Sequence, residues 1–449
     1  MKRILSIATL IMMIVSKTFA QSFPADSLSY VIEKAGQAIA EYQLRLGLYY
    51  SDEKDYNKAF LWFKQAAYQG LMPAQAALGL CYASGQGVSQ DYNQAVFWYK
   101  KAAEQGDANA QAQLGYFYKS GIGVSQSDDM AFLGYKKAAE QNLPIAQHGL
   151  GLCYYNGFGV EKNYTETVVW FEKAIENGDI EAYVSLGLCY FNGLGVTKNQ
   201  QKAVELYKKA AEKGCPKAQY NLGICFITGE GVEQNYNKAV NLLKEAIKHE
   251  KLDAQNTVVA QYNLGICYYE GYGVKKDYTE AVNWFEKAAN QGYADAQARL
   301  GLCYERGYGV TKNAKRAAEL YKKATEKGCP EAQYNLAMCY YTGNGVPQDY
   351  NQMVYWLKEA AKHGIIDAQY NLGVCYYEGN GVAKDYKEAA MWFEKATKQG
   401  LADAQYNLAS CYDKGKGVHK DLDKAVYWYE KAAKQGFPEA KAQLQRLQR

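Results

Sequence analysis

The sequence predicts an all-α protein built as a solenoid of stacked helix-turn-helix repeats, and three observations support this. A leucine recurs every 36 residues from Leu78 to Leu222, and again from Leu264 to Leu444. A Gly-x-Gly-Val turn returns at the same interval. The apolar residues between these marks follow the 3.6-residue period of a helix. A fixed period of roughly 20–50 residues is typical of an array of small units that bury their apolar faces only against one another.

Residues 1–20 have the pattern of a secretory signal peptide. Lys2 and Arg3 precede an apolar run that is short for a bilayer span, and Thr18–Ala20 offers small residues before a cleavage point. We therefore expect an exported protein, periplasmic or secreted, with an uncleaved membrane anchor as the alternative. No later stretch is apolar enough to cross a membrane, so no membrane span is expected after removal of the signal.

The repeat around Leu264 illustrates the first helix of the predicted unit. Ala260, Leu264, Cys267 and Tyr268 fall on one side of a helix by the helical period. The turn that begins at Gly271 ends this helix, because glycine adopts backbone angles that other residues avoid.

A second helix follows the turn. Asp277 and Glu280 have the spacing of an N-terminal capping pair, in which Asp accepts from free amides and Glu reaches back. Trp284 and Phe285 belong to the apolar face of this helix, and Gly292 ends it. The glycine that follows each leucine is expected to remove bulk where the two helices approach.

The repeated motif is Ala-x-x-x-Leu-Gly-x-x-Tyr, then Gly-x-Gly-Val, then Asp-Tyr-x-x-Ala-x-x-Trp-Phe/Tyr-x-x-Ala-Ala. It resembles the hallmark of the Sel1-like repeat (SLR) family, a relative of the tetratricopeptide repeat, over ten repeats at residues 72–438. The resemblance implies a right-handed α-α superhelix with first helices lining a concave face. It also implies an adaptor role in assembling signalling or envelope complexes, of the secreted or periplasmic bacterial type.

Three segments depart from this pattern. Residues 21–71 are predicted to form an N-terminal helix and a first repeat that resembles a plain tetratricopeptide repeat, since it is short and lacks the glycine turn. Six extra residues, Asn256–Gln261, are expected to lengthen a first helix or to form a bulge. Residues 439–449 are expected to form a C-terminal capping helix with a basic outer side.

One stripe of the first helices is the candidate partner-binding surface. Tyr262 and Tyr269 lie about opposite Leu264 around the helix axis, and an asparagine follows the first tyrosine. If Leu264 faces its partner helix, this stripe faces the groove, where tyrosine suits a peptide or a glycan because it contributes contact area at low entropic cost. The candidate residues are Tyr262, Asn263, Tyr269, Tyr334, Asn335, Tyr341, Tyr370, Asn371, Tyr377, Tyr406 and Asn407.

Two alternatives are open for this stripe. The tyrosines either line an open groove or pack against the next repeat and are largely covered. In tetratricopeptide repeats, asparagines at the matching place often hold the backbone of a bound peptide. Here they either do the same or form hydrogen bonds between repeats.

The 11 cysteines are predicted to be buried thiols rather than a disulfide framework. Nine of them share one register on the core face, and equivalent residues on stacked helices stand roughly 8–10 Å apart. A disulfide needs Cα atoms within roughly 7 Å. Cys215 and Cys329 are expected in loops. Cysteine-rich secreted members of the family bridge the two helices of each repeat, but the matching cysteine of the second helix is missing here.

Catalytic and metal chemistry are poorly supported. The four histidines, His148 among them, fall in four different repeats without ligand spacing, so no metal site and no cofactor are expected. Ser51 and Lys54 match the Ser-x-x-Lys element of β-lactamase-like enzymes, but the Ser-Asp-Asn and Lys-Thr-Gly elements are missing. The chain has 51 basic and 47 acidic residues, a balance that does not favour nucleic acid as a partner.

The sequence therefore predicts a non-enzymatic scaffold or adaptor that binds a protein or peptide of unknown identity along the concave groove. A peptidoglycan- or glycan-binding envelope module, with a cell-wall polymer as partner, is the alternative that uses the same stripe. A β-lactamase-like hydrolase is a second and weaker alternative.

Overall fold

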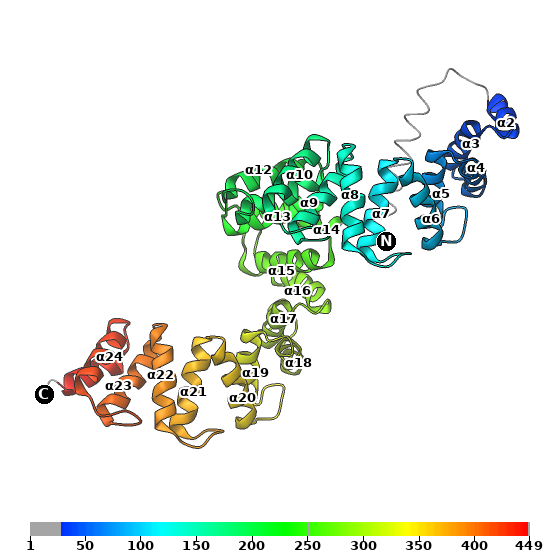
Figure 1. The fold of residues 1–449 in the computed structure, drawn as a ribbon. Helices are drawn as coiled ribbons and strands as arrows, with labels where there is room; N and C mark the ends of the chain where they lie inside the picture. The colour runs from blue at the N-terminus through cyan, green and yellow to red at the C-terminus, as the bar shows by residue number, and fades with distance from the viewer. Residues whose placement is uncertain (1–27, 250–251, 448–449) are drawn as a thin grey trace. The chain divides into compact units, whose positions relative to one another are not determined.

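The computed structural model describes residues 28–249 and 252–447, so the predicted signal peptide lies outside the described residues. The described residues form 24 α-helices and no strands, which confirms the all-α repeat fold. The chain divides into two compact units, Met1–Glu233 and Gln234–Arg449 (Figure 1).

The first unit contains α2 (Leu28–Gly36) followed by repeats whose first and second helices alternate. Its first helices are α3 (Ala40–Asp52), α5 (Met72–Ser84), α7 (Ala108–Ser120), α9 (Pro144–Asn156), α11 (Glu181–Asn192) and α13 (Pro216–Thr228). Its second helices are α4 (Tyr56–Tyr68), α6 (Tyr92–Glu104), α8 (Asp128–Glu140), α10 (Tyr164–Glu176) and α12 (Gln200–Glu212).

The second unit continues the alternation and ends with α25 (Pro438–Leu447), where a capping helix is expected. Its second helices are α14 (Tyr236–Lys248), α16 (Tyr278–Asn290), α18 (Ala314–Thr325), α20 (Tyr350–Lys362), α22 (Tyr386–Lys398) and α24 (Leu422–Lys434). Its first helices are α15 (Ala254–Glu270), α17 (Ala294–Arg306), α19 (Pro330–Thr342), α21 (Ile366–Glu378) and α23 (Ala402–Lys414).

The helices begin and end at the predicted capping and turn residues, with one correction. The Asp277 carboxylate accepts from the amides of Thr279 and Glu280 at 2.9 and 3.1 Å, as an N-cap residue does. The expected return bond from the Glu280 side chain is wrong, because the Asp277 amide donates to the Tyr268 carbonyl at 2.9 Å. That backbone bond ties the turn to the first helix, so the turn needs no help from Glu280.

Glycines set the close approach of neighbouring helices. A Cβ added at Gly265 would lie 2.5 Å from the Phe285 ring, which confirms that this register requires the smallest residue. The second glycine of the turn has a further reason to recur in the ten repeats that have the turn. A Cβ at Gly273 would overlap the backbone of Tyr236, the first residue of α14, so the turn rests directly on the preceding repeat.

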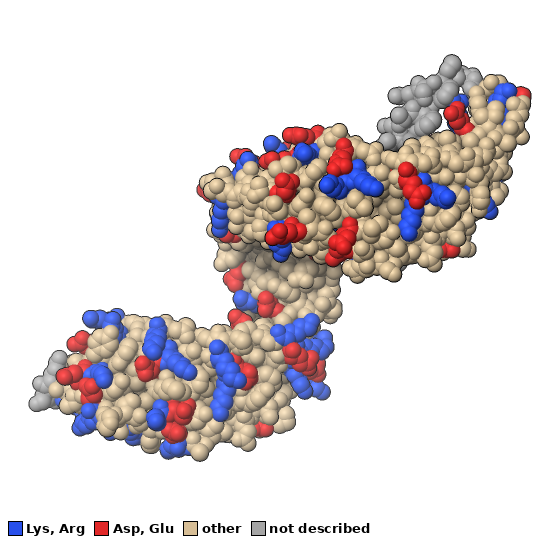
Figure 2. Space-filling view, viewed as in Figure 1, with Lys and Arg blue, Asp and Glu red and all other residues tan. Residues whose placement is uncertain are grey.

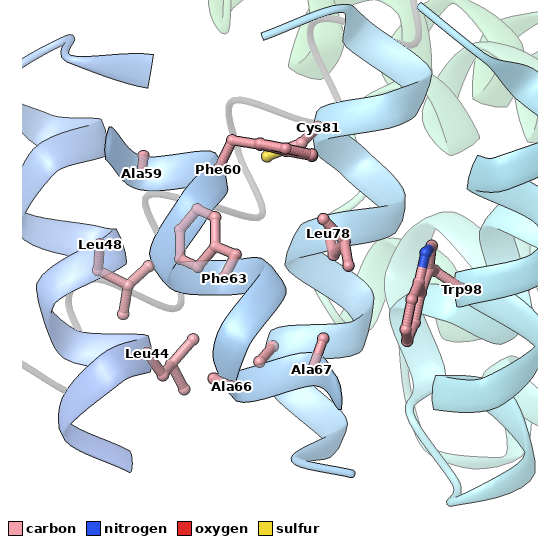
Figure 3. Close-up of a cluster of buried hydrophobic side chains, with 11 residues drawn as sticks. Leu44, Leu48, Ala59, Phe60, Phe63, Ala66, Ala67, Leu78, Cys81 and Trp98 are labelled. Atoms are coloured by element: carbon pink, nitrogen blue, oxygen red, sulfur yellow. The ribbon is translucent and has the colours of Figure 1, made fainter. Parts of the chain in front are cut away.

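Most repeats place an aromatic ring between their own first helix and the first helix of the next repeat, and the same register holds Leu243 and Leu357 in two of them. Figure 3 shows this for Phe63 of α4, which lies between Leu44 of α3 and Leu78 of α5. Within each unit, the two helices of a repeat pack together, and the second helix also packs against the following first helix. The core is therefore a continuous series of small clusters rather than one centre.

A ladder of glutamines joins successive repeats on the polar side of this core. Buried Gln111 in α7 donates Nε2 to the Ala103 carbonyl at 3.2 Å. Gln141, which follows α8, donates Nε2 to Gln111 Oε1 at 2.9 Å and to the Gly106 carbonyl at 3.0 Å. One rung thus connects the ends of two second helices through the first helix between them.

The six extra residues before Leu264 lengthen a first helix, as predicted. α15 has 17 residues, whereas the other first helices of this unit have 13.

The described part of the chain contains no helix that combines the length and apolar character of a membrane span. Charges of both signs are interspersed over the face of each unit that Figure 2 shows. Such a mixed surface agrees with the near balance of acidic and basic residues.

Candidate functional site

The first tyrosine of each stripe segment packs on the core of its repeat. The Tyr262 ring lies 5.2 Å from that of Tyr293 and 6.0 Å from that of Phe285, measured between centroids. Tyr370 and Tyr406 make the same kind of contact, with Phe393 and Phe437 respectively. These residues are half-buried, so part of each side chain remains accessible to solvent.

The second tyrosine of each segment is the last residue but one of its helix, and its exposure varies from segment to segment. Tyr269 and Tyr377 are half-buried and each meets the tyrosine that begins the following second helix, at 5.1 Å between centroids. Tyr341 in α19 is 49% exposed and is the most open candidate. The Tyr377 hydroxyl accepts from Lys416 Nζ at 2.9 Å, so a cation stands at this edge of the stripe.

The asparagines of the stripe take part in bonds between repeats. Asn371 donates Nδ2 to the Tyr334 hydroxyl of the preceding repeat at 3.4 Å, and Asn407 donates to the Tyr370 hydroxyl at 3.3 Å. Asn263, at the lengthened helix, instead donates to the Val259 carbonyl of its own helix at 3.0 Å. Of the two readings left open for the asparagines, these contacts favour the bond between repeats.

Burial and hydrogen bonding act in opposite directions on the tyrosine hydroxyls. Burial raises the pKa of Tyr334 and Tyr370, and the amide of the following repeat opposes this shift. Both hydroxyls therefore stay protonated at neutral pH and offer an O–H donor to a ligand while they accept from asparagine. Half-exposed rings with polar tips are well suited to a polypeptide or sugar chain.

His148 occupies the position that tyrosine holds in other repeats. Contrary to expectation, it contacts two polar side chains. His148 Nε2 lies 2.9 Å from Ser185 Oγ of the next repeat, and His148 Nδ1 lies 3.8 Å from Asp179 Oδ1. A serine, a histidine and an aspartate thus follow one another in the order found in serine hydrolases. However, Ser185 lies inside α11, where backbone amides donate to helical carbonyls, so it brings no free amide to stabilise an oxyanion. We read the pair as a variant rung of the Tyr–Asn series.

All eleven cysteines are buried and free. The burial predicted for the nine that share a register is confirmed. Burial raises the pKa of the Cys81 thiol to about 12 and that of the Cys411 thiol to about 11. Cys215 and Cys329 are the N-cap residues of α13 and α19, in the connections where loops were predicted. Their burial was not predicted.

The remaining sequence matches gain no support from geometry. Ser51 lies in the last turn of α3 rather than in the turn that follows, and it is 7% exposed. No group of three His, Cys, Asp or Glu side chains in the described ranges is placed to hold a metal ion.

A second exposed surface was missed because the outer side of the second helices was read as a solvated face. One register of that side carries large apolar residues in the first unit, namely Leu61, Phe97, Leu133 and Val169, which are 55%, 48%, 40% and 38% exposed. These residues are spaced by 36 in the sequence, so the same periodicity that located the leucines was available to find them.

Comparisons with known proteins agree with this architecture. The profile of the family described as Sel1 repeat matches eleven segments, at residues 40–71, 73–107, 108–143, 144–179, 180–215, 216–250, 258–293, 294–329, 330–365, 366–401 and 402–437. The first of these covers the repeat that departs most from the motif. No curated protein matches the chain at a significant level.

Two solved structures are similar over long stretches. One is a protective antigen present in uropathogenic Escherichia coli strains, displaying an SLR fold. It is 35% identical with a TM-score of 0.83, over 94% of this chain and 90% of the antigen. The other, a Sel1 repeat protein from Oxalobacter formigenes, is 35% identical with a TM-score of 0.50, over 56% of this chain and 96% of that protein.

Proposed function

Because this chain belongs to the Sel1 repeat family, we propose that it is a non-enzymatic scaffold that binds a protein partner outside the cytoplasm. The observation that carries the proposal is the half-exposed tyrosine stripe of the first helices, Tyr341 above all. The signal-like pattern of residues 1–20 supports export. So does the similarity to a protein that its structure describes as a protective antigen.

The proposed partner lies along the first helices and contacts tyrosine edges and hydroxyls. Apolar ring area supplies most of the affinity, and the hydroxyls and amides supply orientation. The cation of Lys416 beside Tyr377 favours a partner with a carboxylate or carbonyl at that point.

The first prediction compares two exposed tyrosines of one repeat. Tyr341 on first helix α19 and Tyr355 on second helix α20 are 49% and 53% exposed. A photoreactive phenylalanine placed at either position in the full chain, followed by irradiation of living cells and mass spectrometry, identifies what touches each helix. Tyr341→Ala should reduce capture of the partner about tenfold with an unchanged melting temperature, since hot-spot tyrosines contribute about 1–2 kcal/mol or more.

The matched variant Tyr355→Ala is the control and should leave capture unchanged. If Tyr355→Ala abolishes capture and Tyr341→Ala does not, the first-helix stripe is not the binding surface. A cell-wall polymer is the second candidate partner, because half-exposed tyrosines also stack on sugars. Sedimentation with purified peptidoglycan that is lost in Tyr341→Ala would favour it over a protein.

A further inference from the structure

All seven tryptophans of the chain stand at one register of the second helices. They are Trp62, Trp98, Trp170, Trp284, Trp356, Trp392 and Trp428. In α8 the same register holds Gly134, and in three other second helices it holds leucine. The first unit therefore offers both filled and unfilled versions of one structural position.

A filled position shows what the indole does. Trp98 is 5% exposed and packs in one cluster with Ala67 of the preceding second helix and Leu78 of its own first helix (Figure 3). Ala67 is thereby covered to 1% exposure. Ala139 is likewise 1% exposed in the cluster against which Trp170 packs. The indole closes a slot between two second helices.

At Gly134 the slot is open. A cavity of about 320 Å³ is lined by Ala103, Leu114, Tyr118 and Leu133 among others. Ala103 and Leu114 are the 36-residue equivalents of Ala67 and Leu78, and Ala103 is only partly buried. Met130 and Leu133 at the rim are 42% and 40% exposed. The volume lies at the lower end of the range for ligand pockets.

The chain cannot close this slot from position 134. A Cβ at Gly134 would lie 2.8 Å from the Gln111 carbonyl oxygen and 2.9 Å from the Gly115 nitrogen. α8 therefore packs backbone to backbone on α7, and any side chain at this position would force the helices apart. The opening is a consequence of helix packing and not of a single deleted side chain.

In other repeats a lysine three residues after the tryptophan lies over the indole ring, and the repeat with Gly134 has a lysine at the same place. Lys173 Nζ lies 4.2 Å from the centroid of the Trp170 ring, and the equivalent Lys287 and Lys395 lie 4.0 and 3.8 Å from theirs. Lys137 stands at the same spacing, three residues after Gly134, and lines the cavity. A ring that entered the slot would meet a cation over its face, an interaction that is strongest for indole.

The recognition would rest on shape and ring charge rather than on the indole N–H. Nε1 of Trp170, Trp284 and Trp392 is buried without a hydrogen-bond partner among the described residues. Leu133, which lines the slot, also belongs to the exposed apolar register of Leu61, Phe97 and Val169. An extended protein segment that laid one aromatic residue into the slot would find apolar contacts on both sides.

We propose that the Gly134 slot binds an aromatic side chain, preferably tryptophan, presented by a protein partner. The inference rests on the proposed scaffold function only in taking the ring to come from a protein. Aromatic residues that fill preformed pockets are the usual anchors of protein interfaces. The slot belongs to the first unit, whereas all the candidate stripe residues belong to the second, so the two surfaces are tested separately.

The test titrates the full chain with N-acetyl-tryptophanamide and follows the probe by saturation-transfer NMR and calorimetry. We expect saturable binding of one equivalent with a Kd on the order of 1 mM, and none for N-acetyl-leucinamide. Ala103→Phe fills the slot from the opposite wall and should weaken binding at least tenfold with an unchanged melting temperature. Lys137→Met should weaken it about two- to fivefold by removing the cation.

The matched control is Ala433→Phe in α24, the same register in the last repeat that the structure describes, where the next described element is first helix α25. It should leave binding unchanged. The proposal would be overturned if the native chain shows no saturable binding. It would also be overturned if the Ala103→Phe and Lys137→Met variants both bind the probe as tightly as the native chain does. Probe binding that persists in Tyr341→Ala, while partner capture is lost, separates the slot from the first-helix surface. If Ala103→Phe misfolds by circular dichroism, Lys137→Met decides.

Discussion

At the scale of single residues, the packing of most repeats depends on a glycine that faces an aromatic ring. A methyl group at Gly373 would lie 2.6 Å from the Phe393 ring. In the preceding repeat the same register holds Ala337, and the facing residue is Leu357 rather than a ring. The last repeat pairs Ala409 with Tyr429, so a shift of the helices is the other way to make room.

Gly373→Ala should therefore destabilise the chain by about 1–3 kcal/mol through overpacking. The double variant Gly373→Ala with Phe393→Leu recreates the Ala337–Leu357 pair and should recover most of that loss. Urea unfolding followed by circular dichroism measures both. Gly36→Ala, where an added Cβ meets nothing within 4 Å, is the control. Strictly additive effects of the two substitutions would contradict a steric origin.

At the scale of helices, the glutamine ladder explains two unsatisfied buried atoms. Oε1 of Gln297 and of Gln333 has no hydrogen-bond partner in the part of the chain that the structure describes. The residues 30 positions later, where Gln141 stands relative to Gln111, are Lys327 and His363. Lys327 makes one of the two contacts of the rung, because its Nζ donates to the Gly292 carbonyl at 2.7 Å. A glutamine at this position, such as Gln141, donates both to that carbonyl and to the buried glutamine oxygen.

His363→Gln should stabilise the second unit by about 1 kcal/mol, because it supplies an amide to a buried oxygen that now lacks one. The melting temperature should rise, and the gain should vanish when Gln333 is also changed to alanine. Gln435, which already donates to Gln405 at 2.9 Å, is the opposite control, since Gln435→His should lower the melting temperature. No change in either variant would mean that solvent satisfies these groups.

The elements were predictable from the sequence, whereas several contacts between them were not. Glycine and aspartate mark helix ends by backbone chemistry alone, so Gly271 and Asp277 located α15 and α16 correctly. The periodic glutamines were visible but not interpreted, because their partners lie 30 residues away and depend on how repeats stack. The direction in which the asparagine side chains point and the open slot at Gly134 also depend on how neighbouring repeats stack. The sequence of a single repeat does not determine that stacking.

At the scale of the whole molecule, stability is distributed over many equivalent small clusters, and their thiols titrate together. Nine cysteines occupy one register in both units, namely Cys81, Cys153, Cys189, Cys225, Cys267, Cys303, Cys339, Cys375 and Cys411. Burial raises the pKa of Cys267, Cys375 and Cys411 from 9.0 to about 11. The folded chain therefore holds these protons more tightly than the unfolded chain does.

This difference predicts alkaline unfolding with a defined onset. Below about pH 8 the thiols are protonated in both states and contribute little pH dependence, because the unfolded thiol has a pKa of 9.0. Between pH 9 and 11 the unfolded chain loses protons that the folded chain keeps, so stability falls by up to about 1.4 kcal/mol per pH unit for each thiol. The melting temperature should be nearly flat from pH 7 to about pH 8 and should then fall with increasing slope. Buried tyrosines add to the fall only near pH 10 and above, because their reference pKa is higher. Replacing Cys267, Cys375 and Cys411 by alanine removes three of the eleven buried thiols and should reduce the slope between pH 9 and 10 by about a quarter. An unchanged slope, or rapid reaction of the native thiols with a disulfide reagent at pH 8, would show that these cysteines are not buried as a set.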